Sequence, residues 1–189
     1  MRCIFSLILV FVIISCKDKA PQKVSNFNKI AIDSTYMLEV PKYMERMELN
    51  DQASLQYGSR FKDAYTVVIS EDKKDFIGYF REIGMYNENL SILKNYTAAQ
   101  VNYFRETMKA SKIEQHDLKQ INGYNAHQFR IEHNVNHYKM AYLIAYIETE
   151  GDLFMIMNWT PLDKFDQLEN TFSTINSSFK YIPLNPNKG

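Results

Sequence analysis

Three consecutive segments between Tyr124 and Thr160 constrain the fold most, because the later two are apolar on both faces. They are expected to be antiparallel strands at residues 124–133, 137–149 and 152–160. In the middle segment, alternate residues give two apolar rows: Tyr138, Met140, Tyr142, Ile144 and Tyr146, against Ala141, Leu143, Ala145 and Ile147. A sheet with one face in water shows polar residues at every second position. The sequence therefore predicts an antiparallel sheet that is covered on both faces.

The N-terminus reads as an export signal that ends at a cysteine. Arg2 supplies a positive charge, and the eleven residues 4–14 form an apolar run with one serine. As a helix this run would span roughly 16 Å, which is too short for the roughly 30 Å hydrocarbon core of a bilayer. The ending Ile13-Ile14-Ser15-Cys16 resembles the lipobox of bacterial lipoproteins, which implies cleavage before the cysteine and acylation of its thiol. We expect residues 1–15 to be a lipoprotein signal peptide and Cys16 to be lipidated. An ordinary secretory peptide or an uncleaved anchor is the alternative.

Cysteine and charge counts exclude several functional classes. Cys3 would leave with the signal peptide and Cys16 would be acylated, so the mature chain would carry no free thiol. Disulfides, thiolate metal sites and cysteine nucleophiles would then be excluded. Lysine plus arginine and aspartate plus glutamate number 22 each, so no net field draws the protein to nucleic acid or to an anionic membrane.

The rest of the chain reads as one domain between a tether and a tail. Residues 16–27 are expected to form the lipidated cysteine and tether, residues 28–183 a single α+β domain, and residues 184–189 a loose tail. Further strands are expected at residues 30–32, 36–40, 53–57, 64–70, 114–120 and 178–182. Asn122-Gly123 predicts a tight turn, residues 134–136 a looser reversal, and Glu150-Gly151 a third reversal.

Three amphipathic segments predict helices. The first covers residues 74–85, with an apolar stripe of Phe76, Phe80 and Ile83. The second begins at a capping box of Thr97 and Gln100 and ends near Ser111, with a stripe of Val101, Phe104 and Met108. The third is expected to have Thr160 as its N-cap and Pro161 as its first residue. Its apolar face would cover one side of the sheet and consists of Leu162, Phe165, Leu168, Phe172 and Ile175.

The layout from Tyr36 to Lys180 resembles the PsbP-like fold, which is also seen in DcrB-like bacterial lipoproteins. The resemblance rests on short stretches: Leu38 to Pro41, Val67 to Ile69, Asn122 to Ala126, the reversal at Glu150-Gly151, and Ser177 to Lys180. It implies an α/β/α sandwich in which helices cover both faces of an antiparallel sheet. For exported members it implies binding or assembly roles, and it carries no catalytic residue to this chain.

No enzyme motif is present, and a histidine pair is the nearest approach to one. The sequence has no phosphate-binding glycine loop, no G-x-S-x-G, no H-E-x-x-H and no EF-hand. His133 and His137 flank a reversal and could hold a transition metal with Glu132 or His127. The competing interpretation is that both are solvated histidines near a turn, with no metal and no cofactor.

Aromatic residues offer the other candidate sites. Tyr138, Tyr142 and Tyr146 share a strand face and could line a platform or a pocket for a ligand, although core filling, with the hydroxyls at the sheet margin, is the favoured interpretation. A surplus of tyrosines near the helices, namely Tyr79, Tyr86, Tyr96 and Tyr103, could form a partner surface.

We expect a membrane-anchored lipoprotein of the bacterial cell envelope that acts as a non-catalytic binding or assembly module. The lipid anchor would hold it at a membrane, with the outer membrane favoured over the inner, and its partner would be an envelope protein. Two alternatives are a small-molecule carrier with a pocket at Tyr142 and Tyr146, and a metal-dependent hydrolase centred on His133 and His137.

Overall fold

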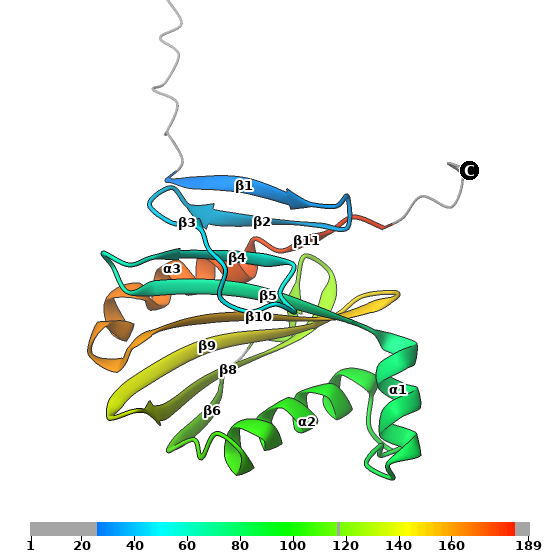
Figure 1. Ribbon diagram of the computed structural model, residues 1–189. Helices are drawn as coiled ribbons and strands as arrows, with labels where there is room; N and C mark the ends of the chain where they lie inside the picture. Colours follow the sequence, from blue (N-terminus) through cyan, green and yellow to red (C-terminus); the bar gives the residue numbers. More distant parts are fainter. Residues whose placement is uncertain (1–25, 117, 184–189) are drawn as a thin grey trace, which may run out of the picture.

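The computed structural model describes residues 26–116 and 118–183 (Figure 1). The predicted signal peptide, Cys16, most of the tether and the tail at 184–189 lie outside the described residues. No helix within the described ranges is both long enough and apolar enough to cross a membrane.

A large antiparallel sheet forms the centre of the described domain. Its strand order is β3-β4-β5-β10-β9-β8-β6, and β7 also pairs with β8. The three central strands predicted from the sequence are confirmed as β8, β9 and β10. The strands are β3 (Glu45–Arg46), β4 (Leu55–Ser59), β5 (Ala64–Asp72), β6 (Lys112–His116), β7 (Gln120–Ile121), β8 (Tyr124–Val135), β9 (Tyr138–Glu148) and β10 (Asp152–Pro161). The single strand expected at residues 114–120 is divided into β6 and β7.

Two-residue turns connect β7 to β8 and β8 to β9. Asn122 and Gly123 have positive φ angles of 48° and 91°, as the predicted tight turn requires. The looser reversal expected at residues 134–136 is wrong, because the turn lies at Asn136 and His137, with φ of 45° and 74°. Val135 still pairs with Tyr138 across this turn. Asn136-His137 is not one of the glycine-containing pairs that mark a two-residue turn, so the tightness of this hairpin could not be read in advance.

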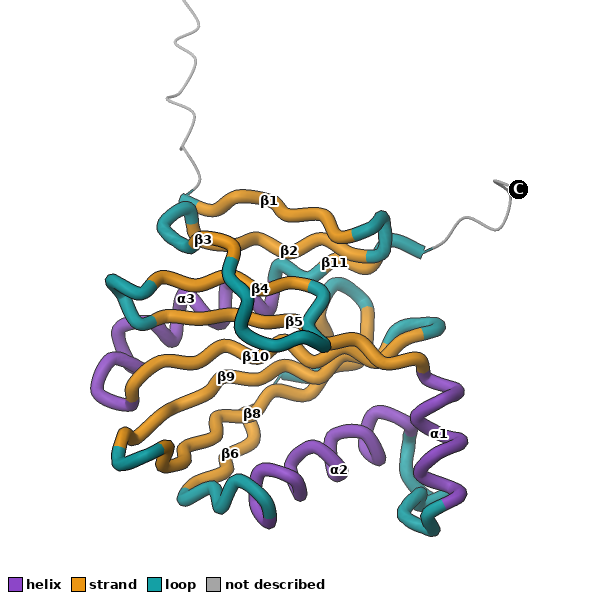
Figure 2. The backbone as a smooth tube through the Cα atoms, in the orientation of Figure 1, coloured by secondary structure: helices purple, strands orange, loops and turns teal. Residues whose placement is uncertain are grey.

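The central sheet is dry on both faces, as the two apolar rows predict. One row of β9, with Leu143 and Ile147, packs in a core that includes Phe165 and Phe172 of α3 (Phe165–Ser177). The other row, with Tyr142 and Tyr146, packs against α1 (Lys73–Glu82) and α2 (Ile92–Glu106). Figure 2 shows α3 on one side of the large sheet and α2 on the other. The predicted α+β fold, an antiparallel sheet between helical layers, is confirmed.

A second, three-stranded sheet covers the α3 side together with that helix. It consists of β1 (Phe27–Ile32), β2 (Tyr36–Pro41) and β11 (Lys180–Tyr181), in the order β1-β2-β11. Three residues of β2, namely Tyr36, Leu38 and Val40, are at most 1% exposed in the shared core. The sequence predicts these strands but not the pairing of β2 with β11, which lie more than a hundred residues apart.

The predicted capping box at Thr97 is wrong. α2 begins at Ile92, and the side chain of Ser91 caps it by accepting a hydrogen bond from the amide of Lys94 at 3.2 Å. Thr97 lies inside the helix, where its hydroxyl is 3.1 Å from Nδ1 of His127 on β8. The helix extends further back because Leu93 and Tyr96 add a buried turn to its apolar face.

The predicted N-cap of the third helix is also wrong, and the first helix ends earlier than expected. Thr160 pairs with Ala141 as part of β10, and its buried hydroxyl has no hydrogen-bond partner. A short 3-10 turn, Leu162–Lys164, therefore precedes α3. α1 is capped by Asp72, whose carboxylate accepts the amides of Lys74 and Asp75 at 2.7 and 3.1 Å. Because α1 ends at Glu82, Ile83 is 43% exposed and lies outside the expected stripe.

A buried polar chain ties α3 to the sheet. Asn158 of β10 accepts the hydroxyl of Thr66 at 2.9 Å and donates to the carbonyl of Leu143 at 3.0 Å. It also donates to Oδ1 of Asn176 on α3 at 2.7 Å, and Asn176 donates to Oε1 of Gln128 at 2.9 Å. Thr66, Asn158 and Asn176 are each 0% exposed. These bonds connect β5, β8, β9, β10 and α3 at one point.

Candidate functional site

The predicted histidine pair does not come together. His133 is only 4% exposed, and its Nε2 lies 3.1 Å from the hydroxyl of Tyr142. His137 is exposed in the β8–β9 turn. The described residues contain no group of three or more His, Cys, Asp or Glu side chains that could hold a metal ion. The competing interpretation of two solvated histidines is also wrong for His133, since burial lowers its pKa and favours the neutral ring.

The tyrosine row fills the core on the α2 side. Tyr142 is 8% and Tyr146 0% exposed, whereas Tyr138 at the end of the row is 72% exposed. The ring of Tyr146 packs edge-on against Tyr96 of α2 at 5.8 Å between centroids. None of the three described pockets is lined by Tyr142 or Tyr146. Core packing, and not the expected ligand pocket, is therefore the role of these two residues.

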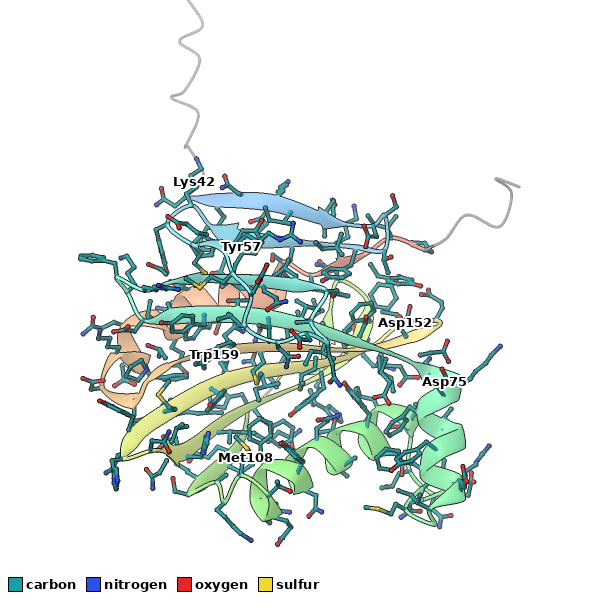
Figure 3. The ribbon with its side chains drawn as sticks, in the orientation of Figure 1. Lys42, Tyr57, Asp75, Met108, Asp152 and Trp159 are labelled. Carbon is teal, nitrogen blue, oxygen red and sulfur yellow. The ribbon has the colours of Figure 1, made fainter. Side chains whose placement is uncertain are left out.

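The pocket with the largest volume of the three lies at the edge of the large sheet formed by β3 and β4. We call it the edge groove: it is lined by residues 30–32 of β1, residues 43–49, β4, the β4–β5 turn, Tyr65 and Trp159. Its volume is about 1530 Å³, and it is open along one side. Tyr57 packs against the core on the α3 side and Trp159 against the core on the α2 side. Figure 3 labels Tyr57 near β4 and Trp159 near β10. The groove therefore crosses the edge of the large sheet and borders both cores.

Two stacked rings form the aromatic end of the edge groove. Tyr65 on β5 and Trp159 on β10 are paired in register, with ring centroids 5.3 Å apart and an interplanar angle of 19°. Gly58 pairs with Tyr65 on the other side. A Cβ atom at Gly58 would lie 2.6 Å from the Tyr65 ring and 2.8 Å from the sulfur of Met47. A glycine is thus required at this position for Tyr65 to lie over β4 and stack on Trp159.

The wall opposite these rings is held in place by Gln56. Its side-chain oxygen accepts the amides of Leu49 and Asn50, and its backbone oxygen accepts the amide of Met47 at 3.0 Å. The loop that follows β3 is therefore fixed to β4 before any ligand arrives. A preformed wall lowers the entropy that binding would cost.

Charges of both signs surround the edge groove. Arg46, Arg60 and Lys62 are exposed, as are Glu45 and Glu48. The ammonium of Lys62 lies 4.6 Å from the centroid of the Tyr43 ring, which is 36% exposed. No histidine or cysteine lines the groove. The lining offers stacking, cation–π contacts and ion pairs, which are means of binding a partner.

The expected tyrosine surface near the helices is present in part. Tyr79 is 58% and Tyr103 51% exposed, but Tyr96 is buried. Tyr86 lies under the guanidinium of Arg81 at 5.1 Å. Further exposed apolar residues, Ile83, Met85 and Leu90, follow Tyr79 at the end of α1 and in the connection to α2. This second surface lines none of the three pockets, whereas the edge groove encloses volume.

Sequence reasoning did not find the edge groove. Its lining comes from residues 30–65 and from Trp159, which share no motif and no period. The one sequence feature that points to the groove is the single tryptophan of the chain, near the end of the third central strand. Its neighbours cannot be predicted without knowing which strand pairs with that strand.

Comparisons with known proteins identify the fold. No protein-family model matches the chain, and no curated protein is similar to it in sequence. The structure is similar to that of the cyanobacterial PsbP protein (CyanoP) of Synechocystis, with a TM-score of 0.57 and 12% identity over 87% of this chain and 97% of that one. It is also similar to the Ran-binding protein Mog1p of Saccharomyces cerevisiae, with a TM-score of 0.54 and 10% identity over 83% and 96%. At these identities the similarity shows the fold alone, and the predicted PsbP-like domain is supported.

Proposed function

We propose that the chain is a lipid-anchored, non-catalytic binding module of the bacterial envelope, which holds an extended segment of a partner protein in the edge groove. The groove itself is the observation that carries the proposal. It has a volume of about 1530 Å³ and a preformed wall, and it combines stacked aromatic rings with charges of both signs.

The size of the edge groove favours a polypeptide over a small molecule. Pockets for small ligands measure about 300–1,000 Å³ and enclose most of the ligand surface. The edge groove has a volume of about 1530 Å³ and is open along one side, so a small ligand would stay largely in water. An extended peptide could stack a side chain on Trp159 and Tyr65 and pair its charges with Arg46 and Glu45.

The two alternatives that the sequence left open gain no support from the geometry. A carrier pocket at Tyr142 and Tyr146 would need space that their packed rings fill. A hydrolase centred on His133 and His137 would need both rings at one ion, but one ring is buried against Tyr142 and the other is exposed in a turn. Mog1p, by its name, binds Ran, so a domain of this fold can serve in protein binding.

The anchor is the part of the proposal that the sequence carries. Cys16 completes a lipobox-like ending, and Asn26, where the described chain begins, is ten positions further along the chain. Ten extended residues reach at most about 36 Å, so the domain would stay close to the lipid. Two or three acyl chains, at about 0.8 kcal/mol per buried methylene, would make the attachment lasting. We place the protein in the envelope, at the outer membrane in preference to the inner.

A variant at the cysteine tests the anchor. Cys16→Ala removes the thiol that would be acylated and should move the protein out of the membrane fraction or leave its signal uncleaved. The measurement is fractionation of cells, with mass spectrometry of the N-terminal peptide. A variant that remains in the membrane pellet with a processed N-terminus would show that the anchor is not the lipid on Cys16.

Site-specific photocrosslinking tests the edge groove in intact cells. A photoreactive amino acid at Tyr57, in the groove, should yield a crosslink to a specific envelope protein. The matched control replaces Tyr103, a tyrosine on α2 that is 51% exposed, and should yield none to that protein. Tyr57→Ala should then reduce recovery of the same partner by at least severalfold, whereas Tyr103→Ala should not. Crosslinks from Tyr103 but not from Tyr57 would move the binding surface to the helices and refute the groove.

A further inference from the structure

We propose that the β4–β5 turn, residues 60–63, rests on the lipid surface to which the chain is anchored. Phe61 at this turn is 93% exposed, the highest exposure of any large hydrophobic side chain in the described ranges. A single exposed apolar residue is ordinary on a protein surface. The inference therefore depends on the position of Phe61 in the molecule and on the charges beside it.

The turn lies at the end of the domain where the described chain begins, at Asn26. The ammonium of Lys62 lies over the ring of Tyr43 at 4.6 Å. The neighbouring amide of Lys42 donates to the carbonyl of Asn26 at 2.9 Å. These contacts connect the turn to the first described residue, and Figure 1 shows the start of β1 and the β4–β5 turn on the same side. At most about 36 Å of extended chain separates Asn26 from Cys16, so this end of the domain stays within reach of the headgroups.

The charges at the tip suit an anionic lipid surface. Arg60 and Lys62 flank Phe61, and both are exposed, as is Lys42. The one acid of the turn, Asp63, is already paired with Lys164 of the 3-10 turn. Glu45 and Glu48 line the same groove, but the residues adjacent to Phe61 are cationic. An aromatic ring between basic side chains is the composition found where proteins enter the interfacial region of a bilayer.

This contact would orient the edge groove. Because Phe61 and Lys62 belong to its lining, the groove would open beside the headgroups, and a partner would enter it along the membrane plane. α1 lies at the other end of the sheet in Figure 1 and would face away from the lipid. The inference rests on the proposed lipid anchor and adds to it a fixed orientation of the domain.

Fluorescence of a single tryptophan tests the contact on the full lipidated chain. Trp159→Phe removes the native tryptophan, and Phe61→Trp then places the reporter on the turn. The protein is reconstituted in vesicles of equal amounts of phosphatidylcholine and phosphatidylglycerol, with and without bromine on the acyl chains of the phosphatidylcholine. We expect emission at shorter wavelength than in detergent-free buffer, and quenching by the brominated lipid.

The matched control carries Tyr79→Trp on α1 in the same background, and thermal unfolding of both proteins verifies that the substitutions leave the fold intact. The control should emit as a solvated tryptophan and show no quenching by bromine. Arg60→Glu combined with Lys62→Glu should abolish the quenching of the turn reporter by the brominated lipid. Protein that sediments with the vesicles while its turn reporter stays solvated would overturn the orientation and leave the anchor standing. Protein that does not sediment would overturn both, and equal quenching of the two reporters would overturn the orientation.

Discussion

Removing the side chain of Asn158 should cost more stability than any other polar-to-alanine change in the domain. Asn158→Ala deprives the Thr66 hydroxyl of its acceptor and the oxygens of Leu143 and Asn176 of a donor. All of these contacts are buried, and water cannot replace the lost partners without opening the interface between α3 and the sheet. The damage therefore reaches four strands and one helix at once.

The magnitude follows from the number of groups left without a partner. Each buried polar group that loses its hydrogen bond costs about 1–3 kcal/mol, and the cavity adds to this cost. We expect a total of about 3–5 kcal/mol, a large part of the roughly 5–15 kcal/mol by which a domain is stable. At about 2–4 °C per kcal/mol for a domain of this size, Tm should fall by about 10 °C or more.

Asn158→Asp separates hydrogen bonding from size. The introduced carboxylate keeps the acceptor for Thr66, but it faces the oxygens of Leu143 and Asn176 and is buried, so its pKa in the folded state is raised. The unfolded chain then loses the proton more readily than the folded chain, and the variant is least stable at neutral pH. Its deficit relative to the native protein should shrink as the pH is lowered toward the unfolded pKa of about 3.9.

Urea unfolding at neutral and acidic pH measures both effects. Asn170→Ala, an exposed asparagine on the same helix, is the control and should change the free energy of unfolding by less than about 0.5 kcal/mol. A cost below about 1 kcal/mol for Asn158→Ala, or a deficit of Asn158→Asp that grows in acid, would show that the polar chain does not hold α3 on the sheet.

Two further predictions concern the groove and the buried histidine. Gly58→Val should push the Tyr65 ring off Trp159 and cost about 1–3 kcal/mol. Near-ultraviolet circular dichroism of the single tryptophan reports the displacement, and an unchanged spectrum would contradict the contact. The native protein should lose stability as the pH falls from about 7.5 to about 5.5, because burial lowers the pKa of His133 below its unfolded value near 6.5, so that the unfolded state binds more protons. His133→Gln should flatten this dependence in thermal melts, and an identical slope would exclude the histidine as its cause.

The sequence predicts the centre of this fold well, because its information there is local. Alternate residues of the 138–147 segment are apolar in both phases, which leaves no face for water, and the structure covers both faces. Asn122-Gly123 predicts its turn because both residues tolerate positive φ.

Pairing and competition explain where the sequence prediction fails. Thr160 has the chemistry of a helix cap, but its ladder position opposite Ala141 keeps it in the strand. The small sheet and the edge groove depend on which distant segments become neighbours. The hydrophobic periodicity of one segment carries no information about its neighbours. The same reason explains why the sequence does not predict the burial of His133. A residue next to a turn is buried here only because of where α2 packs.

The position of β10 in the large sheet has a consequence for the timing of folding. β5 pairs on one side with β10, which is synthesised much later. β2 pairs on one side with β11, which is the last strand to be synthesised. While the ribosome is still adding residues beyond α2, β1 can pair with β2 and β4 with β3 and β5, but β2 and β5 each still lack their second neighbour, and the loops that must close are long. The large sheet and the two cores on its faces are therefore completed only when nearly the whole chain has been made.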